Sequence, residues 1–150
     1  MNQLMNYQTR KAELKDIMFF YEAICFITGL ESDINEFNKK FKATLKDKSA
    51  ILMVIETDGK AVGCILAQTR QQLSDLHSFV EIQELYISPK FRNHKAADFL
   101  YNDFEDKYIQ KEHKQIKVNC NINSTLNQNF YIKKGFKIFK KQYKKELNNK

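Results

Sequence analysis

The chain has 150 residues, a mass of 17.8 kDa and a net charge of +7. Its 43% hydrophobic and 29% charged residues are a globular balance that argues against disorder, and its length is that of one domain. No apolar run approaches the roughly 20 residues of a membrane helix, and residues 1–7 lack the basic-then-apolar order of a secretory signal. We therefore expect a single domain, residues 1–150, in the cytoplasm.

Hydrophobic periodicity and turn residues divide the chain into helices and strands. Asp58-Gly59 is typical of a tight hairpin turn, and Gly29, Pro89 and Gly135 mark the ends of elements. In chain order we predict helices at 14–28 and 33–45, strands at 51–57, 61–69 and 79–88, a helix at 93–110, a strand at 116–120, a helix at 123–134 and a strand at 136–147. A hairpin combined with strand–helix–strand crossovers predicts an α/β (α+β) sheet with helices on both faces.

The three cysteines are odd in number and far apart, at positions 25, 64 and 120. Without a CxxC pair, the sequence predicts no disulfide framework and no metal site. We interpret the cysteines as small buried hydrophobic residues in a reducing compartment.

The net charge is concentrated at the C-terminus, because residues 133–150 hold eight lysines and one acid, Glu146. Phe136, Phe139 and Tyr143 alternate with these lysines. This pattern is typical of a solvated amphipathic strand, and it also resembles a stacking platform for nucleic acid. We favour the strand, so nucleic acid and membrane are not among the expected partners.

The segment that follows the strand at 79–88 has the features of a phosphate-binding turn. It enters a helix through Arg92-Asn93-His94-Lys95-Ala96-Ala97. The first turn of a helix offers free backbone N–H groups and the positive end of the helix dipole. Small residues there allow close approach of an anion, although an ordinary strand-to-helix turn explains the spacing equally well.

Two motifs resemble the GNAT superfamily of N-acetyltransferases. Residues 92–97 match its Gln/Arg-x-x-Gly-x-Gly/Ala signature, with Lys95 in place of the middle glycine, and Phe130-Tyr131-x-x-x-Gly135-Phe136 matches a second signature about 35 residues later. Residues 37–47, 58–63 and 81–85 resemble the aminoalkylphosphonate N-acetyltransferase branch. The resemblance implies a mixed, mostly antiparallel sheet and acetyl transfer from acetyl-CoA to a small primary amine.

The resemblance also implies how acetyl-CoA is bound. Its pantetheine would lie along the strand end like an added strand, with the backbone N–H of Leu85 as the oxyanion donor, and its pyrophosphate would lie on the turn at 92–97. Ser124, with its neighbours, stands near the place of a family asparagine that bonds to pantetheine. The expected cofactor-binding residues are Leu85, Tyr86, Ile87, Arg92, Asn93, His94, Lys95, Ala96, Ala97, Asn123, Ser124 and Asn127.

Tyr131, Glu84 and Glu81 are the candidate catalytic residues. A phenol such as Tyr131 can donate a proton to the departing sulfur, and a carboxylate in a sheet can accept one from an ammonium. Strict alternation puts the two glutamates on opposite faces unless the strand is bulged, and we favour Glu84 because it directly precedes Leu85. The alternatives are a core aromatic for Tyr131 and ion pairs with helix lysines for the glutamates.

Residues of both charges are candidates for binding the acceptor amine. Arg70 and His77 suit an acidic tail, whereas Glu31 suits a cationic amine. We predict an aminoalkylphosphonate-like amine. The alternatives are a polyamine or other cationic amine, and a catalytically impaired CoA-binding relative, to which Lys95 points. A homodimer is left open.

Overall fold

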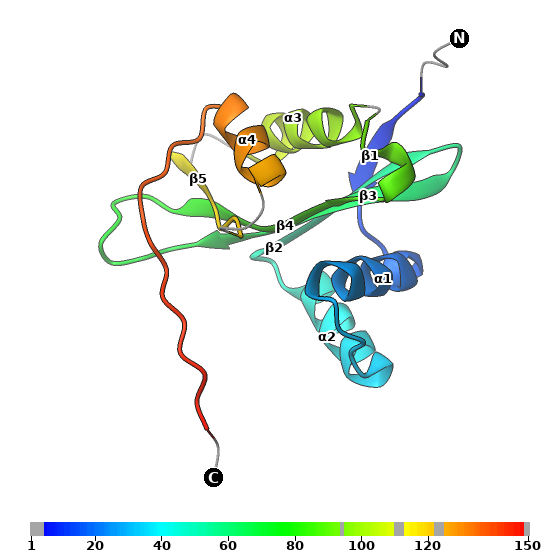
Figure 1. Cartoon of the computed structure of the whole chain (residues 1–150), viewed down its shortest axis with the longest axis horizontal. Coiled ribbons are helices and arrows are strands. Elements are labelled where there is room, and N and C mark those ends of the chain that lie inside the picture. The colour runs from blue at the N-terminus through cyan, green and yellow to red at the C-terminus, as the bar shows by residue number, and fades with distance from the viewer. Residues whose placement is uncertain (1–4, 94, 110–112, 122–124, 149–150) are drawn as a thin grey trace. The chain divides into compact units, whose positions relative to one another are not determined.

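The computed structural model describes residues 5–93, 95–109, 113–121 and 125–148 (Figure 1). They form two compact units, one ending at Asn119 and one beginning at Cys120. The second unit contains one helix, α4 (Thr125–Lys133). The first unit contains, in order, β1 (Gln8–Lys11), η1 (Leu14–Asp16), α1 (Ile17–Thr28), α2 (Ile34–Lys46), β2 (Ala50–Thr57), β3 (Lys60–Arg70), β4 (Phe79–Ile87), η2 (Pro89–Phe91), α3 (Ala96–Tyr108) and β5 (Gln115–Val118).

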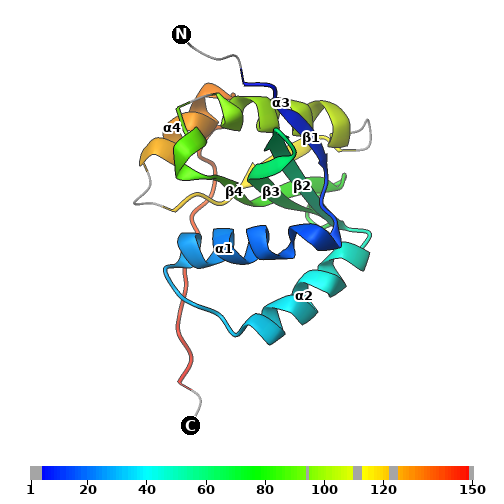
Figure 2. The same ribbon diagram turned by 90° about the vertical axis from the view of Figure 1, so that its right-hand side faces the viewer.

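The first unit is built on a five-stranded sheet in the order β1-β2-β3-β4-β5. All neighbours are antiparallel except β4 and β5, which run parallel. Helices α1 and α2 cover one face of the sheet and α3 covers the other (Figures 1 and 2). The predicted fold class, a mixed and mostly antiparallel sheet with helices on both faces, is confirmed.

Aromatic packing joins α1 and α2 to the sheet. Phe20 of α1 and Phe41 of α2 have ring centroids 5.1 Å apart and pack with Leu52, Val54 and Cys64. Burying a side chain of this size contributes about 2–3 kcal/mol. Helix α3 likewise buries Leu100, Tyr101 and Phe104 completely. Both helical layers are therefore fixed to the sheet by hydrophobic burial.

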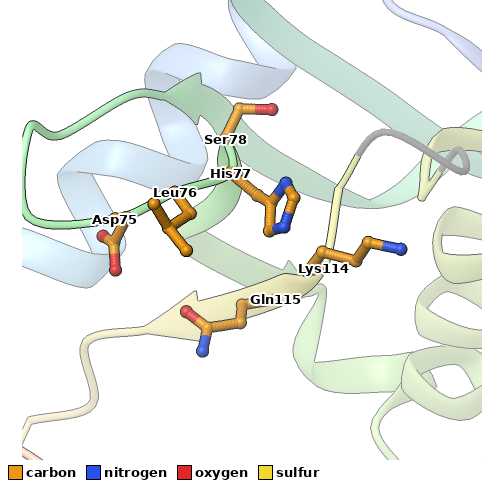
Figure 3. A pocket seen from close by; sticks show the side chains of 6 residues that line it. All are labelled: Asp75, Leu76, His77, Ser78, Lys114 and Gln115. Carbon is orange, nitrogen blue, oxygen red and sulfur yellow. The ribbon is translucent and has the colours of Figure 1, made fainter.

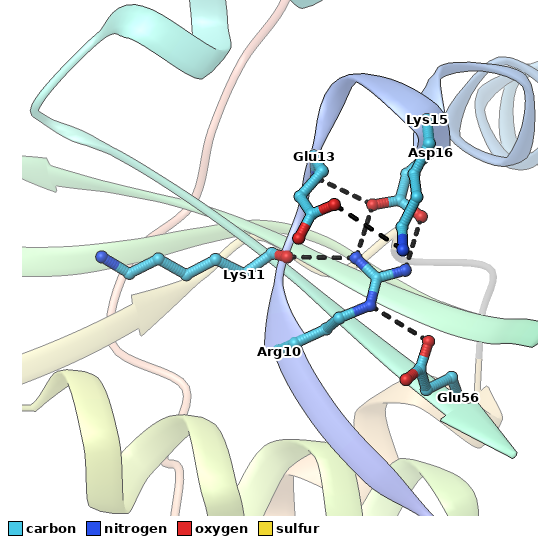
Figure 4. Close-up of polar contacts among 6 residues, drawn as sticks. All are labelled: Arg10, Lys11, Glu13, Lys15, Asp16 and Glu56. Atoms are coloured by element: carbon cyan, nitrogen blue, oxygen red, sulfur yellow. Dashed lines mark hydrogen bonds and ion pairs between the residues drawn. The ribbon is translucent and has the colours of Figure 1, made fainter. Parts of the chain in front are cut away.

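Strand β1, which the sequence patterns did not predict, is held by Arg10 (Figure 4). The Arg10 guanidinium donates to both carboxylate oxygens of Asp16 at 2.7 and 2.8 Å and to Glu56 at 3.0 Å. Burial alone would raise the pKa of Asp16, but the hydrogen bonds from Arg10 and from the Glu13 backbone outweigh it and hold the pKa below its usual value. One arginine thus connects β1, β2 and the start of α1.

The C-terminal segment differs from the prediction. Residues 137–148 form no strand among the described residues, and Ile138, Phe139, Tyr143 and Leu147 are exposed. A strand requires a partner for its backbone hydrogen bonds, and an alternating pattern does not provide one.

Of the helices within the described ranges, none combines the length and apolarity needed to cross a membrane.

Candidate active site

A β-bulge in β4 brings the two candidate glutamates onto one face of the sheet. Ile82 pairs with Ala67 and Glu84 with Leu66, so Gln83 has no opposite residue on β3. Glu81 lies opposite Gln68, which is two residues from Leu66 on the regular strand β3. Leu66 packs on the core beneath α1 and α2. Both glutamates therefore lie on the α1–α2 face, and the bulge overrides the alternation that would separate them.

Beyond the bulge, the edge of β4 that faces away from β3 has no partner strand among the described residues, and we refer to it as the open edge. Strand β5 pairs only with Phe79–Ile82 of β4. The N–H of Ser88 donates to Val62 of β3 at 2.8 Å, and alternate residues of an antiparallel pair face the same neighbour. The N–H groups of Leu85 and Ile87 therefore point away from β3, to the side that β5 has left. Within the described residues no strand pairs with this edge, and an extended ligand can bond there as an added strand.

The turn into α3 places a lysine in a left-handed backbone conformation. Lys95 has φ 61° and ψ 16° and is the N-cap of α3, and its carbonyl accepts from Phe99 at 3.0 Å. This region favours glycine and costs other residues about 1–2 kcal/mol. The N–H groups of the residues that follow, beginning with Ala96 and Ala97, lie in the first helical turn and have no acceptor within the helix. The turn therefore fits an anionic group such as the pyrophosphate of CoA.

Arg92, the first residue of the motif, is anchored to the end of β4. Its Nε donates to the carbonyl of Ile87 at 3.0 Å, and its guanidinium lies 4.9 Å from the ring centroid of Phe26. Sequence reasoning missed Phe26, because nothing in the motif points to the last turn of α1. Asn93, next in the motif, is exposed.

The environments of the two glutamates differ. Glu84 is partly buried, and burial raises its pKa. A carboxylate with a raised pKa is a stronger proton acceptor near neutral pH. Glu81 instead forms an ion pair with Nε of Arg70 at 2.9 Å, a strand arginine rather than a helix lysine. The geometry therefore favours Glu84 as the candidate base.

The other two acceptor candidates, Glu31 and His77, lie on different connections between elements. Glu31 is exposed in the connection between α1 and α2. His77 lines a shallow hollow of about 100 Å³ before the start of β4 (Figure 3). The other lining residues are Asp75, Leu76, Ser78, Lys114 and Gln115.

A cation that sequence reasoning missed is Lys117 on β5. It is in register with Glu81 and therefore lies on the same face as Glu81 and Arg70. It pairs with Asp75 at 3.2 Å, and its Nζ lies 3.7 Å from the ring centroid of Phe79. Only the pairing of β5 with β4 reveals this position, which no local pattern marks.

The second unit contains the other predicted motif. Tyr131 is 7% exposed and contacts the rings of Phe130 and Phe136 edge-on, at centroid distances of 5.2 and 5.3 Å. Its carbonyl accepts from the N–H of Phe136 across Gly135, which has φ 94°. Asn127 is exposed on α4. His94, Asn123 and Ser124 lie outside the described residues, and the roles predicted for all these side chains remain predictions.

Known proteins share this arrangement of elements. A possible acetyltransferase from Clostridium difficile 630 is 19% identical, with a TM-score of 0.79 and coverage of 95% of this chain and 99% of that one. The glucosamine-6-phosphate N-acetyltransferase of Arabidopsis thaliana is 20% identical, with a TM-score of 0.78 and the same coverage. An aminoglycoside N-acetyltransferase in complex with CoA is 13% identical, with a TM-score of 0.83 and coverage of 99% of both chains.

At these identities the structures show a common fold. No curated protein sequence is significantly similar to the chain. Residues 21–147, however, match the sequence profile of the family described as acetyltransferase (GNAT) domain. The chain therefore belongs to the GNAT family and is an N-acetyltransferase that uses acetyl-CoA.

Proposed function

We propose that the chain acetylates a small primary amine that has an acidic tail, such as an aminoalkylphosphonate. The observation that carries this proposal is the adjacency of Glu84, a partly buried carboxylate with a raised pKa, and Leu85, whose N–H faces the open edge of β4. Acetyl-CoA supplies an activated thioester when it is bound. The residues of the chain then have to bind it, receive a proton from the amine and stabilise charge.

Each of these tasks has a candidate group. The Leu85 N–H donates to the negative charge that develops on the acetyl carbonyl oxygen. Glu84 accepts a proton from the ammonium, directly or through one water. Tyr131 donates to the sulfur as it leaves. The turn at 92–97 holds the pyrophosphate, and residues 123, 124 and 127 contribute contacts to pantetheine.

The charges beside Glu84 suit a zwitterionic substrate. With the bulge between them, Glu84 and Glu81 are about two strand positions apart, or about 7 Å. Arg70 and Lys117 lie at the Glu81 end of this face. Among the described residues, only Nε of the Arg70 guanidinium has a hydrogen-bond partner, which is Glu81. The two terminal NH₂ groups of Arg70 can therefore donate to a phosphonate. An ammonium at Glu84 and an anionic tail at Arg70 therefore fit one small molecule.

A polyamine is the second candidate, because the two cations near Glu81 are already paired with acids. Arg70 is bound to Glu81 and Lys117 to Asp75, so an ionised Glu84 makes this group of five side chains net negative. Glu31 adds an exposed acid in the connection before α2. A substrate with two cationic ends is attracted by such a surface.

A comparison of amines tests the proposal. Acetyl-CoA binding is first established by calorimetry and by its effect on Tm, and absence of both would indicate a relative that has lost the activity. CoA release is then measured for aminomethylphosphonate, aminoethylphosphonate, an amino acid and spermidine. We expect the highest kcat/KM for a phosphonate.

The Arg70→Ala variant tests whether Arg70 binds the acidic tail of the substrate. It should lower kcat/KM for the phosphonate about tenfold or more and leave the value for an amine without a tail unchanged. Lys60→Ala is the matched control, because it removes a cation at the opposite end of β3. A tenfold preference for spermidine, with Arg70→Ala fully active, would refute the acidic tail.

A further inference from the structure

Three side chains from separate elements are in contact at the end of β4, with the two rings tilted by 57°; we name this cluster the Arg92 stack, and it consists of Phe26 of α1, Tyr86 of β4 and Arg92 after η2. The rings of Phe26 and Tyr86 have centroids 5.5 Å apart. The Arg92 guanidinium lies 4.9 Å from the first ring centroid and 5.9 Å from the second. Phe26 is 56% exposed, so its ring reaches the protein surface at this point.

The same arginine closes the turn between β4 and α3. Its Nε donates to the Ile87 carbonyl at 3.0 Å, across the residues of η2. Ile87 belongs to the open edge of β4, and the turn beyond Arg92 leads to Lys95 and the first N–H groups of α3. This hydrogen bond therefore links the two parts of the chain to which the proposed function assigns acetyl-CoA, and the inference below rests on that assignment.

We infer that Arg92 is a positioning residue: through the Arg92 stack, α1 sets the geometry of the turn at 92–97 and thereby the affinity for CoA. A planar guanidinium can lie against two rings while its Nε donates in its own plane, which the ammonium of a lysine cannot do. The contribution of Arg92 then depends on shape and on Phe26, and not only on its charge.

CoA titration calorimetry on the full chain, without any amine, tests the inference. Phe26→Leu should weaken CoA binding about three- to fivefold, and Arg92→Lys about tenfold, although the lysine keeps the charge. The double variant should bind about as weakly as Arg92→Lys alone, because either change breaks the same stack. Phe26→Tyr, which keeps a ring, should restore the affinity to within twofold of the unsubstituted chain.

Met18→Ala is the matched control, since Met18 is also a partly exposed apolar residue of α1 but is not part of the Arg92 stack. It should leave the CoA affinity unchanged, and the apo Tm of each variant confirms that it folds. An Arg92→Lys variant with full affinity, or a Phe26→Leu variant that binds CoA normally, would overturn the inference. So would single-variant losses that multiply in the double variant.

Discussion

Replacing Lys95 by glycine should stabilise the protein, although glycine usually destabilises an ordered segment. Lys95 has φ 61°, and relief of this strain contributes about 1–2 kcal/mol. Glycine adds about 0.5–1 kcal/mol of conformational entropy to the unfolded chain, which opposes the gain. Lys95 makes no side-chain cap to α3, so no such bond is lost. The net gain is about 0.5–1 kcal/mol, or about 2 °C in Tm for a chain of this length.

Thermal unfolding of the apo protein measures this gain against a matched control. Lys42 is exposed in the interior of α2, where Lys42→Gly should cost about 1 kcal/mol and lower Tm by a few degrees. The same chemical change should thus have opposite signs at the two positions. A Lys95→Gly variant that loses as much stability as Lys42→Gly would refute the argument from backbone strain.

Four further outcomes are expected. Lys95→Glu should weaken CoA binding in calorimetry more than Lys95→Gly does, because it places an anion at the phosphate turn. Glu84→Gln should lower kcat at neutral pH, and kcat should partly recover at high pH, where the amine is already neutral. In the unsubstituted enzyme, the acidic limb of the kcat/KM profile should lie above the usual glutamate pKa, since burial raises the pKa of Glu84. Tyr131→Phe should lower kcat with little change in the KM for acetyl-CoA, as steady-state kinetics will show. Arg10→Ala should lower the free energy of unfolding, measured in urea at neutral pH, by about 3 kcal/mol. This difference should shrink as the pH falls through the lowered pKa of Asp16, because protonation of Asp16 removes the ion pair from the unsubstituted protein as well.

Elements whose signals are local could be predicted from the sequence. Asp58 and Gly59 both have positive φ, 51° and 74°, as a tight hairpin turn requires, and they join β2 to β3 as predicted. Asp33 accepts hydrogen bonds from the N–H groups of Asn35 and Glu36 and so begins α2 where the apolar spacing begins. Lys95 has the left-handed conformation that explains a glycine in the motif.

Features that depend on a partner strand could not be predicted. Strand β1 has the sequence Gln-Thr-Arg-Lys, without apolar alternation, and pairs with β2 through its backbone. The position of Lys117 beside Glu81 follows from the register of β5. The segment 136–147 has the alternating pattern of a strand, but among the described residues it pairs with no other strand. The spacing of apolar residues around Tyr131 indicates a buried ring, and Tyr131 is buried. A buried tyrosine can be a core aromatic or a proton donor, so the spacing could not distinguish the two.

The bulge at Gln83 makes the length of β4 more important than the identity of that residue. Its position coincides with the end of the β5 ladder, whose last pair is Ile82 with Val118. A bulge bends and twists its strand, so an additional residue here separates the second half of β4 from its parallel neighbour. Substitutions at Gln83 keep this residue count, whereas a deletion would allow β5 to continue along Leu85 and Ile87. Selection should therefore tolerate many side chains at position 83 but few changes in the number of residues between Ile82 and Glu84.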